Sequence, residues 1–252
     1  MRLEQKSSIA PSFFDNAAVI HLAAVVGERQ VLSNLEHSYK VNVTGAVNLA
    51  RAVQQSNSSR FIFVSTSHVY AATRPDMTLD ENSACLPRGH YALQKLIAEE
   101  LITDVFRYDP SRLVIARVFS VLDKNQPTGT LGNSIIAVAR DDSKVLSYVD
   151  DQRDFLSPRT VADALKTIAS ATHFSGKINV CSGQEVSIRQ AVRNLLGDKE
   201  YERVEPRLGS GQSSVPRIVG SARLFEDAVG LSGAAMFAKS LADWQMDSSS
   251  TV

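Results

Sequence analysis

The chain has 252 residues, enough for one large domain or two small lobes around a sizeable buried core. Its 27 Lys and Arg residues balance 27 Asp and Glu residues, which argues against an overall field that would attract nucleic acid or an anionic membrane. Only Cys85 and Cys181 are present, far apart in the chain, so neither a disulfide framework nor a metal site is expected. These features predict a protein of the reducing cytoplasm.

The N-terminal residues 1–15 lack the basic start and the apolar run of about 7–15 residues that a signal peptide needs. No later segment approaches the roughly 18 apolar residues of a membrane span. We therefore expect neither export nor membrane insertion.

Short apolar runs alternate with segments of helical periodicity through the first half of the chain. Strands are expected at 17–24, 61–65 and 113–118, and helices at about 39–53 and 89–106. Nearly unbroken apolar strands are typical of a sheet covered on both faces, and their alternation with helices predicts right-handed crossovers. The expected fold class is therefore α/β, with a doubly wound, Rossmann-like parallel sheet.

The pattern loosens beyond Leu122, where Gly, Ser, Pro and charged residues become frequent. We expect residues 1–122 to form the nucleotide-binding core and residues 123–252 to form mostly a smaller substrate-binding lobe. A segment of about 145–182 is expected to return to the core. Ligands of open α/β sheets bind at the carboxyl ends of the strands, so this lobe is expected at that edge.

Tyr91 and Lys95 lie four residues apart on the second expected helix and therefore share one face. An ammonium about 6 Å from a phenol, at an effective dielectric of about 20, favours the phenolate by roughly 3 kcal/mol. This predicts a Tyr91 pKa about 2 units below its usual value near 10, and hence a usable base. The alternative is that both side chains only extend along a helix surface toward solvent.

A cluster of hydroxyl groups, Ser65, Thr66 and Ser67, follows the strand at 61–65. Because active sites of α/β proteins lie where strands end, one of these hydroxyls is placed to share a proton with a substrate oxygen. The alternative is that they only bond to loop backbone groups. His68 follows the cluster, and we expect it to be a packed or hydrogen-bonded residue rather than a catalytic acid.

Six short segments occur in a characteristic order. They are Val19-Ile-His-Leu-Ala-Ala24, Asn42-Val-Thr-Gly45, Phe61-Ile-Phe-Val-Ser-Thr-Ser-His-Val-Tyr70, Tyr91-Ala-Leu-Gln-Lys95, Arg117-Val-Phe-Ser120 and Arg153-Asp-Phe155. In this order they resemble the extended short-chain dehydrogenases/reductases of the NAD-dependent epimerase/dehydratase family. The resemblance runs from about Asp15 to Leu231 and is specific as a series, although each segment is weak alone.

The resemblance implies a role for each matched residue. Tyr91 would exchange a proton with the substrate, Lys95 would bind the nicotinamide ribose and tune Tyr91, and Thr66 would hold the reacting oxygen. The residues implied to contact the cofactor are Leu22, Ala23, Ala24, Asn42, Ser65, Tyr91, Lys95 and Phe119. Those implied to contact the substrate are Thr66, Ser67, Ser120 and Arg153. The guanidinium of Arg153 suits a sugar-nucleotide phosphate, although it could instead pair with Asp151 or Asp154.

Three departures from the family pattern qualify these expectations. No glycine-rich phosphate turn precedes the strand at 17–24, because the first glycine is Gly27. We therefore expect an N-terminally truncated chain that lacks the first βαβ strands, with weakened cofactor affinity. Ser67-His68 replaces the Asp-Glu of the family's sugar dehydratases, which disfavours dehydration, and Ser120 replaces the usual asparagine.

The expected function is an NAD- or NADP-dependent epimerase or reductase acting on a hydroxyl or carbonyl group of a nucleotide-linked sugar. A non-sugar carbonyl substrate remains an alternative because fold membership does not determine the substrate. A second hypothesis is a degenerate, cofactor-free member that serves as a binding or structural subunit. Helices near Asn42 and Tyr91 are the expected contact in a homodimer.

Overall fold

The computed structural model describes residues 3, 9–71, 77–213 and 215–249. The chain divides into two compact units. The first comprises Met1–Ala71, Ser83–Val118 and Ala164–Ile178, and the second comprises Ala72–Asn82, Phe119–Asp163 and Asn179–Val252.

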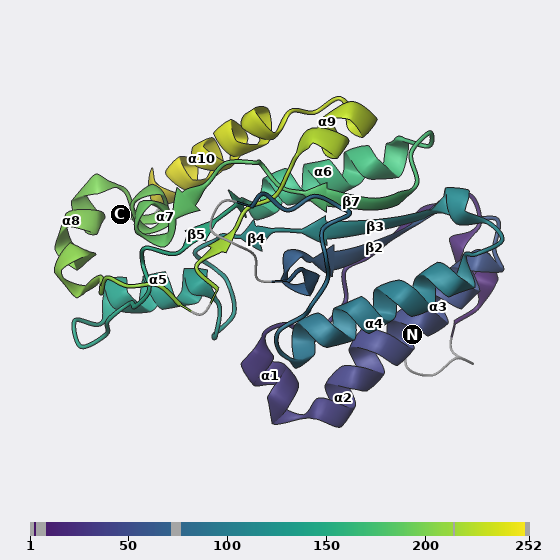
Figure 1. Ribbon diagram of the computed structural model, residues 1–252, viewed down its shortest axis with the longest axis horizontal. Helices are drawn as coiled ribbons and strands as arrows, with labels where there is room; N and C mark the ends of the chain where they lie inside the picture. The colour runs from purple at the N-terminus through teal and green to yellow at the C-terminus, as the bar shows by residue number, and fades with distance from the viewer. Residues whose placement is uncertain (1–2, 4–8, 72–76, 214, 250–252) are drawn as a thin grey trace. The chain divides into compact units, whose positions relative to one another are not determined.

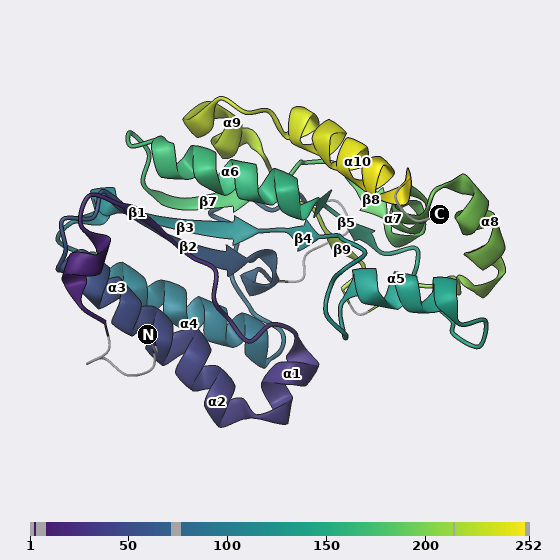
Figure 2. The same cartoon turned by 180° about the vertical axis from the view of Figure 1, so that it is seen from behind.

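A four-stranded sheet forms the centre of the first unit. Its strands are β1 (Ala18–His21), β2 (Arg60–Thr66), β3 (Leu113–Val118) and β7 (Gly176–Val180), in the order β1-β2-β3-β7. The pairs β1–β2 and β2–β3 are parallel, and β1 stands at one end of this order (Figure 2). The parallel α/β fold predicted from the alternating strands and helices is confirmed.

Helices cover both faces of this sheet, as in a doubly wound fold. One long helical segment runs through α2 (Leu35–Tyr39), the π-helical turn η3 (Lys40–Gly45) and α3 (Ala46–Gln54). It packs beside α4 (His90–Val105), and a short helix α1 (Glu28–Ser33) contacts α4. Figure 1 shows α3 and α4 on one face of the sheet and α6 (Pro158–Ser170) on the other. The two strands between these layers, β2 and β3, are almost wholly buried, which explains their unbroken apolar sequences.

The core between α3, α4 and the sheet is built from small and aromatic side chains. Ala46, Ala50 and Ala98 let the helices approach closely, whereas Phe61 and Phe106 fill the space at the sheet. The rings of Phe61 and Phe106 stack with centroids 5.8 Å apart and an interplanar angle of 8°. On the opposite face, the guanidinium of Arg60 donates hydrogen bonds to the backbone oxygens of Ile168 and Ala171. These contacts attach β2 to both covering layers.

The second unit contains two small sheets. One pairs β4 (Ser120–Val121) with β6 (Phe155–Leu156), and the other has the order β8-β5-β9 with β8 (Val186–Ser187), β5 (Gln152–Arg153) and β9 (Arg217–Ile218). Its helices are α5 (Leu131–Arg140), α7 (Ile188–Leu196), α8 (Asp198–Val204), α9 (Arg223–Val229) and α10 (Gly233–Ser249). Trp244 is buried in its core, where its indole Nε1 donates a hydrogen bond to the Leu122 oxygen at 2.8 Å.

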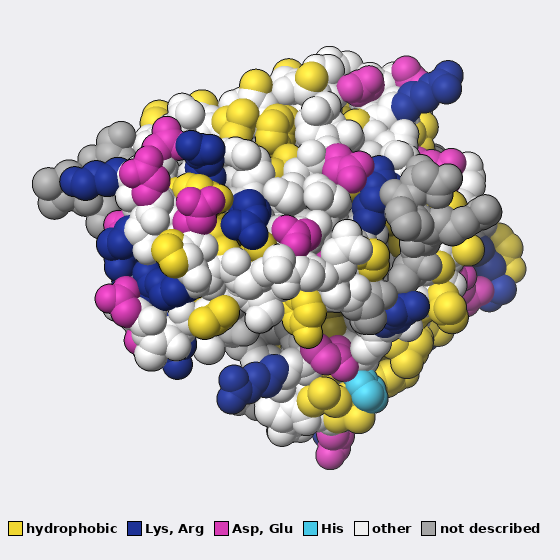
Figure 3. All heavy atoms as spheres, turned by 60° about the vertical axis from the view of Figure 1, so that its left-hand side comes forward, with side chains coloured by type: hydrophobic (Ala, Val, Ile, Leu, Met, Phe, Trp, Pro, Cys, Tyr) yellow, Lys and Arg dark blue, Asp and Glu magenta, His cyan; other side chains and the backbone are white. Residues whose placement is uncertain are grey.

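Among the described residues, four single turns of 3-10 helix connect the larger elements. They are η2 (Pro11–Phe14), η4 (Ser67–Val69), η5 (Pro110–Arg112) and η6 (Glu205–Arg207). In the part of the chain that the structure describes, no helix is long and apolar enough to cross a bilayer. Acidic and basic side chains are interspersed over the face in Figure 3.

Phe106→Ala should lower the free energy of unfolding by about 3–5 kcal/mol, because it removes a fully buried ring that stacks on the ring of Phe61. Urea denaturation followed by circular dichroism measures this change. Phe13→Ala is the matched control, since the Phe13 side chain is 75% exposed, and it should change stability by less than about 0.5 kcal/mol. Equal effects of the two substitutions would contradict this account of the core.

Candidate active site

The first unit brings together Tyr91, Lys95 and the hydroxyl cluster at the end of β2. Tyr91 and Lys95 lie in the first two turns of α4, and Ser65 and Thr66 end β2. Helix α4 packs against both β2 and η4, the turn that begins with Ser67. The sequence prediction that these residues meet at the carboxyl edge of the sheet therefore agrees with the placement of their elements.

Lys95 is buried rather than extended toward solvent, with 3% of its surface exposed. Its Nζ lies 4.2 Å from the centroid of the Phe63 ring. Burial lowers the pKa of Lys95 to about 8, although the nearby charge of Glu99 acts in the opposite direction. Burial and the charge of Lys95 also lower the pKa of His21 to about 4, which keeps that imidazole neutral. Lys95 is therefore mostly protonated at neutral pH, and its positive charge can affect the proton affinity of a nearby side chain.

The predicted low pKa of Tyr91 is wrong for this structure. Burial raises the pKa of Tyr91 to about 12, because desolvation disfavours the phenolate. The four-residue spacing places Tyr91 and Lys95 on a common helix face, but the ammonium lies over the Phe63 ring. The loss of hydration at the phenol therefore outweighs the attraction that spacing alone suggested, and Tyr91 carries its proton at neutral pH.

A buried network built on Glu99 lies one helical turn beyond Lys95. The Glu99 carboxylate is fully buried and accepts hydrogen bonds from Arg117 Nη2 at 2.7 Å and from Arg117 Nε at 3.2 Å. The Ser65 hydroxyl donates to the same carboxylate, so Ser65 is committed to this network. Burial acts to lower the pKa of Arg117, but the bonds and charge of Glu99 outweigh it and raise the pKa. Sequence reasoning overlooked Glu99, although its four-residue spacing from Lys95 was a usable signal.

The hydroxyl of Thr66 is held by the residue two positions along the chain. Thr66 Oγ1 accepts a hydrogen bond from the backbone N–H of His68 at 3.3 Å and lies 3.2 Å from His68 Nδ1. His68 is exposed, whereas Thr66 and Ser67 are buried. The expectation that His68 is a hydrogen-bonded residue is thus met, and its partner is the predicted catalytic threonine.

The loop after β1 carries the residues predicted to line the cofactor. Leu22 is 64% exposed and Ala23 is exposed beside it, which leaves an exposed apolar strip at the end of the strand. This strip belongs to the first unit, as do Tyr91 and Lys95 of α4.

Asn42 lies behind this loop rather than at its surface. Its Oδ1 accepts a hydrogen bond from Val25 N at 2.7 Å, and its Nδ2 donates to Val25 O at 2.9 Å and to Gln94 Oε1 at 2.8 Å. Gln94 in turn donates to the Ser38 hydroxyl at 3.0 Å. Both N–H donors of Asn42 are used by these bonds, so the buried amide holds the loop at Val25 and contacts Gln94 of α4.

Phe119, Ser120 and Arg153 belong to the second unit. Phe119 is buried against Gly220, where an added Cβ would lie 2.7 Å from the Phe119 ring. Arg153 Nη2 forms an ion pair with Asp151 Oδ2 at 3.0 Å, and its side chain is only 15% exposed. Pairing with Asp151, one of the alternatives for Arg153, is therefore observed, although the pair is largely buried.

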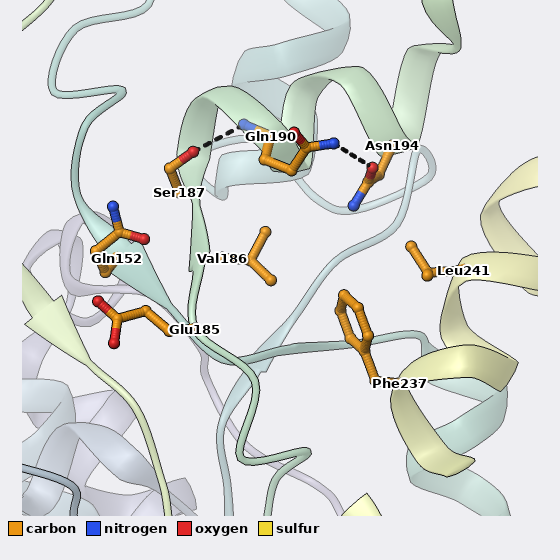
Figure 4. A pocket seen from close by; sticks show the side chains of 8 residues that line it. All are labelled: Gln152, Glu185, Val186, Ser187, Gln190, Asn194, Phe237 and Leu241. Carbon is orange, nitrogen blue, oxygen red and sulfur yellow. Dashed lines mark hydrogen bonds between the residues drawn. The ribbon is translucent and has the colours of Figure 1, made fainter. Parts of the chain in front are cut away.

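The second unit also has a pocket of about 460 Å³ beside β5, shown in Figure 4. Its lining residues are Gln152, Glu185, Val186, Ser187, Gln190, Asn194, Phe237 and Leu241. Gln152 and Arg153 are successive residues of β5, so their side chains point to opposite faces of that sheet. The pocket is lined from both faces of this sheet, because Val186 lies opposite Arg153 and Ser187 lies opposite Gln152. Among the described residues, no cluster of three potential metal ligands occurs.

Comparison with known proteins identifies the family. Residues 3–181 match the sequence model of the NAD dependent epimerase/dehydratase family. The chain belongs to this family. The resemblance seen in the six sequence segments is thereby confirmed, and the protein is a member of an enzyme family.

Similar family members are nucleotide-sugar enzymes. The GDP-6-deoxy-D-mannose reductase of Pseudomonas aeruginosa is 26% identical over 227 residues, covering 84% of this chain and 74% of the relative. The UDP-glucose 4-epimerase of Mycolicibacterium smegmatis is 25% identical over 209 residues, covering 78% of this chain and 66% of the relative.

A solved structure supports the fold of this family member. The structure of RMD from Pseudomonas aeruginosa complexed with NADPH aligns with a TM-score of 0.77 at 24% identity, covering 97% of this chain and 87% of that one.

The buried ammonium of Lys95 predicts a pH dependence of stability. Because its pKa is about 8 in the folded protein and 10.5 in the unfolded chain, the unfolded chain binds more protons between these values. This group should therefore make the protein more stable as the pH rises from 8. The stability advantage of Lys95→Met over the parent should shrink between about pH 8 and pH 9.5, below the range in which tyrosines ionise.

Urea denaturation at several pH values measures this difference. Lys177→Met is the matched control, because the Lys177 side chain is 37% exposed and pairs with Glu100, which is also exposed. Its difference from the parent should stay constant over the same range. A constant difference for Lys95→Met as well would contradict the assigned burial.

Proposed function

We propose that this family member is an NAD- or NADP-dependent reductase or epimerase of a nucleotide-linked sugar, with Tyr91 as its proton-transfer residue. The observation that supports the proposal is that α4, which carries Tyr91 and buried Lys95, packs against β2, which ends at Thr66. The nucleotide-sugar reductase and epimerase among its relatives support the substrate class.

The neutral phenol of Tyr91 is ready to donate a proton to a carbonyl oxygen. A bound nicotinamide would supply or accept the hydride at the carbon of that group. Thr66 holds the same oxygen through its hydroxyl, which is already oriented by His68. When a hydroxyl is oxidised instead, Tyr91 must act as the phenolate, which the ammonium of Lys95 stabilises, and it becomes the neutral phenol again as it takes the proton of the hydroxyl. An epimerase uses both directions in turn.

The raised pKa of Tyr91 keeps the phenol in the protonated form that carbonyl reduction requires. Ser67-His68 follows Thr66 in place of two carboxylates, so water elimination lacks its acid and base. Reduction or epimerisation of a sugar carbonyl or hydroxyl is therefore preferred to dehydration.

The remaining contacts follow from the placement of the predicted residues. Leu22, Ala23 and Ala24 would contact the nicotinamide nucleoside, with Tyr91 and Lys95 bonding to its ribose. Ser65 and Asn42 act from behind, by holding α4 and the loop. Phe119 is proposed as a further cofactor contact, and Ser120 and Arg153 as substrate contacts, Arg153 toward the sugar-nucleotide phosphates. We also propose a cytoplasmic setting, in which Cys85 and Cys181 stay free thiols.

Tyr91→Phe should abolish turnover, lowering kcat by at least about a hundredfold, because the ring remains but no proton can be exchanged. Oxidation of NADPH or NADH with a panel of GDP- and UDP-linked keto sugars measures the reductase reaction, and chromatography of UDP-hexoses measures epimerisation. Unchanged circular dichroism and thermal stability would show that the fold is intact. A variant with parental turnover would contradict the role of Tyr91.

A titration of the parent protein with NADPH and NADH, followed by nicotinamide fluorescence, tests the rival hypothesis of a cofactor-free binding subunit. Micromolar binding would exclude that hypothesis. The absence of binding together with the absence of turnover would favour it over the enzyme.

We further propose that the protein forms a homodimer through α4 and the segment α2–η3. Large apolar side chains are exposed on both helices: Leu93 and Leu101, two turns apart on α4, and Leu35 and Tyr39, one turn apart on α2. Leu93→Glu combined with Leu101→Glu should shift the protein from dimer to monomer in sedimentation velocity. The matched pair Glu100→Gln and Asp104→Asn on the same helix should leave the dimer intact. A parent protein that sediments as a monomer would contradict the proposal.

A further inference from the structure

Helix α4 begins without a cap of its own. Its N-cap residue is Gly89, which has no side chain to accept a hydrogen bond from the first turn. The first N–H groups of any helix lack partners within the helix, and their exposed dipoles attract negative charge. Helix α4 has 16 residues and carries Tyr91 in its first turn, so the missing hydrogen-bond acceptor lies at the backbone of Tyr91 itself.

Glu28 supplies the missing cap from another part of the chain. Its Oε1 accepts a hydrogen bond from His90 N at 2.9 Å, and its Oε2 accepts one from Tyr91 N at 3.1 Å. The His90 imidazole Nδ1 lies 3.1 Å from the same carboxylate. Slight burial acts to raise the pKa of Glu28, but these hydrogen bonds outweigh it and lower the pKa. The carboxylate is thus held in its charged form at the helix start.

The glycine at position 89 is required by this arrangement in two ways. Its φ of +91° is a conformation that residues with a side chain rarely adopt. A Cβ added there would also lie 2.7 Å from Glu28 Oε2, inside contact distance. The chain therefore leaves space at Gly89 for the carboxylate of Glu28, and a conventional capping side chain could not take its place.

Glu28 also stands at the end of the loop that carries Leu22, Ala23 and Ala24. The middle of this loop is tied to the second turn of α4, because Asn42 bonds both to Val25 and to Gln94. Glu28 ties the end of the loop to the first turn, at the backbone of Tyr91 itself. Two polar connections thus join this loop to two successive turns of α4.

We propose that Glu28 is a positioning residue that keeps Tyr91 in register with the loop at Leu22–Ala24. This inference rests on the proposed function, in which that loop contacts the nicotinamide nucleoside and Tyr91 transfers the proton. A simple helix cap would stabilise α4 alone. A tether couples the position of the proton donor to the position of the loop.

Glu28→Gln tests the tether with little change of shape, since an amide keeps only one acceptor oxygen. The matched control is Glu36→Gln, which removes the same charge from an exposed glutamate that pairs with Lys40 at 2.6 Å. Backbone hydrogen exchange by mass spectrometry is measured on the peptides covering residues 22–28 and 90–94. Glu28→Gln should speed exchange about fivefold or more in both peptides, as expected for the loss of a cap, and Glu36→Gln in neither.

Kinetics provide the second measurement, with NADPH and the keto sugar on which the parent is active. Glu28→Gln should lower kcat by about tenfold to a hundredfold, because a proton donor displaced by a fraction of an ångström works poorly. The KM for the sugar should change by less than about threefold, since no sugar contact is removed. Glu36→Gln should match the parent in both constants.

Three outcomes would overturn the proposal: unchanged exchange in both peptides, faster exchange in 90–94 alone, or faster exchange in both with parental kcat. These are separate from failure of the proposed function, which Tyr91→Phe decides. If the parent turns over no sugar, the exchange of the 22–28 peptide decides between tether and cap, because it needs neither cofactor nor substrate.

Discussion

The buried ion pair between Glu99 and Arg117 joins the helix that carries Tyr91 and Lys95 to the strands that end at the site. Glu99 lies on α4, Arg117 lies on β3, and Ser65 at the end of β2 donates to the same carboxylate. Breaking such a pair on one side leaves an unpaired charge in the core, which typically costs about 3–5 kcal/mol. The relative position of helix and strands is therefore specified by charge as well as by the apolar packing of Phe61 and Phe106.

The carboxylate of this pair also acts on Lys95, against the larger effect of burial. The ammonium has lost most of its hydration, and the nearby Glu99 charge is what opposes its deprotonation. Glu99 is shared between two cations, so its orientation toward Arg117 limits how far it can compensate Lys95. Burial is consequently the dominant effect at both residues. It lowers the pKa of Lys95 and raises the pKa of Tyr91, and both shifts favour the uncharged form of the side chain.

Much of the core was predictable from the sequence because hydrophobic periodicity is a local property. The strand at 113–118 coincides with β3, and the helix at about 89–106 differs from α4 by one residue at each end. The Tyr91 pKa was not predictable in the same way. Four-residue spacing determines which side chains share a face, whereas desolvation depends on everything that packs around them.

The roles of Glu28 and Asn42 show a second limit of sequence reasoning. The family pattern marks Asn42 as part of the site, but only the folded chain shows that its amide is spent on Val25 and Gln94. Glu28 lies 62 residues before its partner His90, so no local signal connects them. Glu99 is the contrasting case, because its spacing from Lys95 could have revealed it.

The π-helical turn at Lys40–Gly45 makes the number of residues between α2 and α3 important. A π turn holds one more residue than the corresponding α-helical turn, so it shifts the phase of every residue that follows. Asn42 faces the loop and Ala46, Ala50 and Val53 face the sheet only with this extra residue in place. A single deletion between α2 and α3 would regularise the helix yet rotate one of these two faces away from its partner. The locally less regular helix is therefore the one that lets a single segment serve both the core and the site.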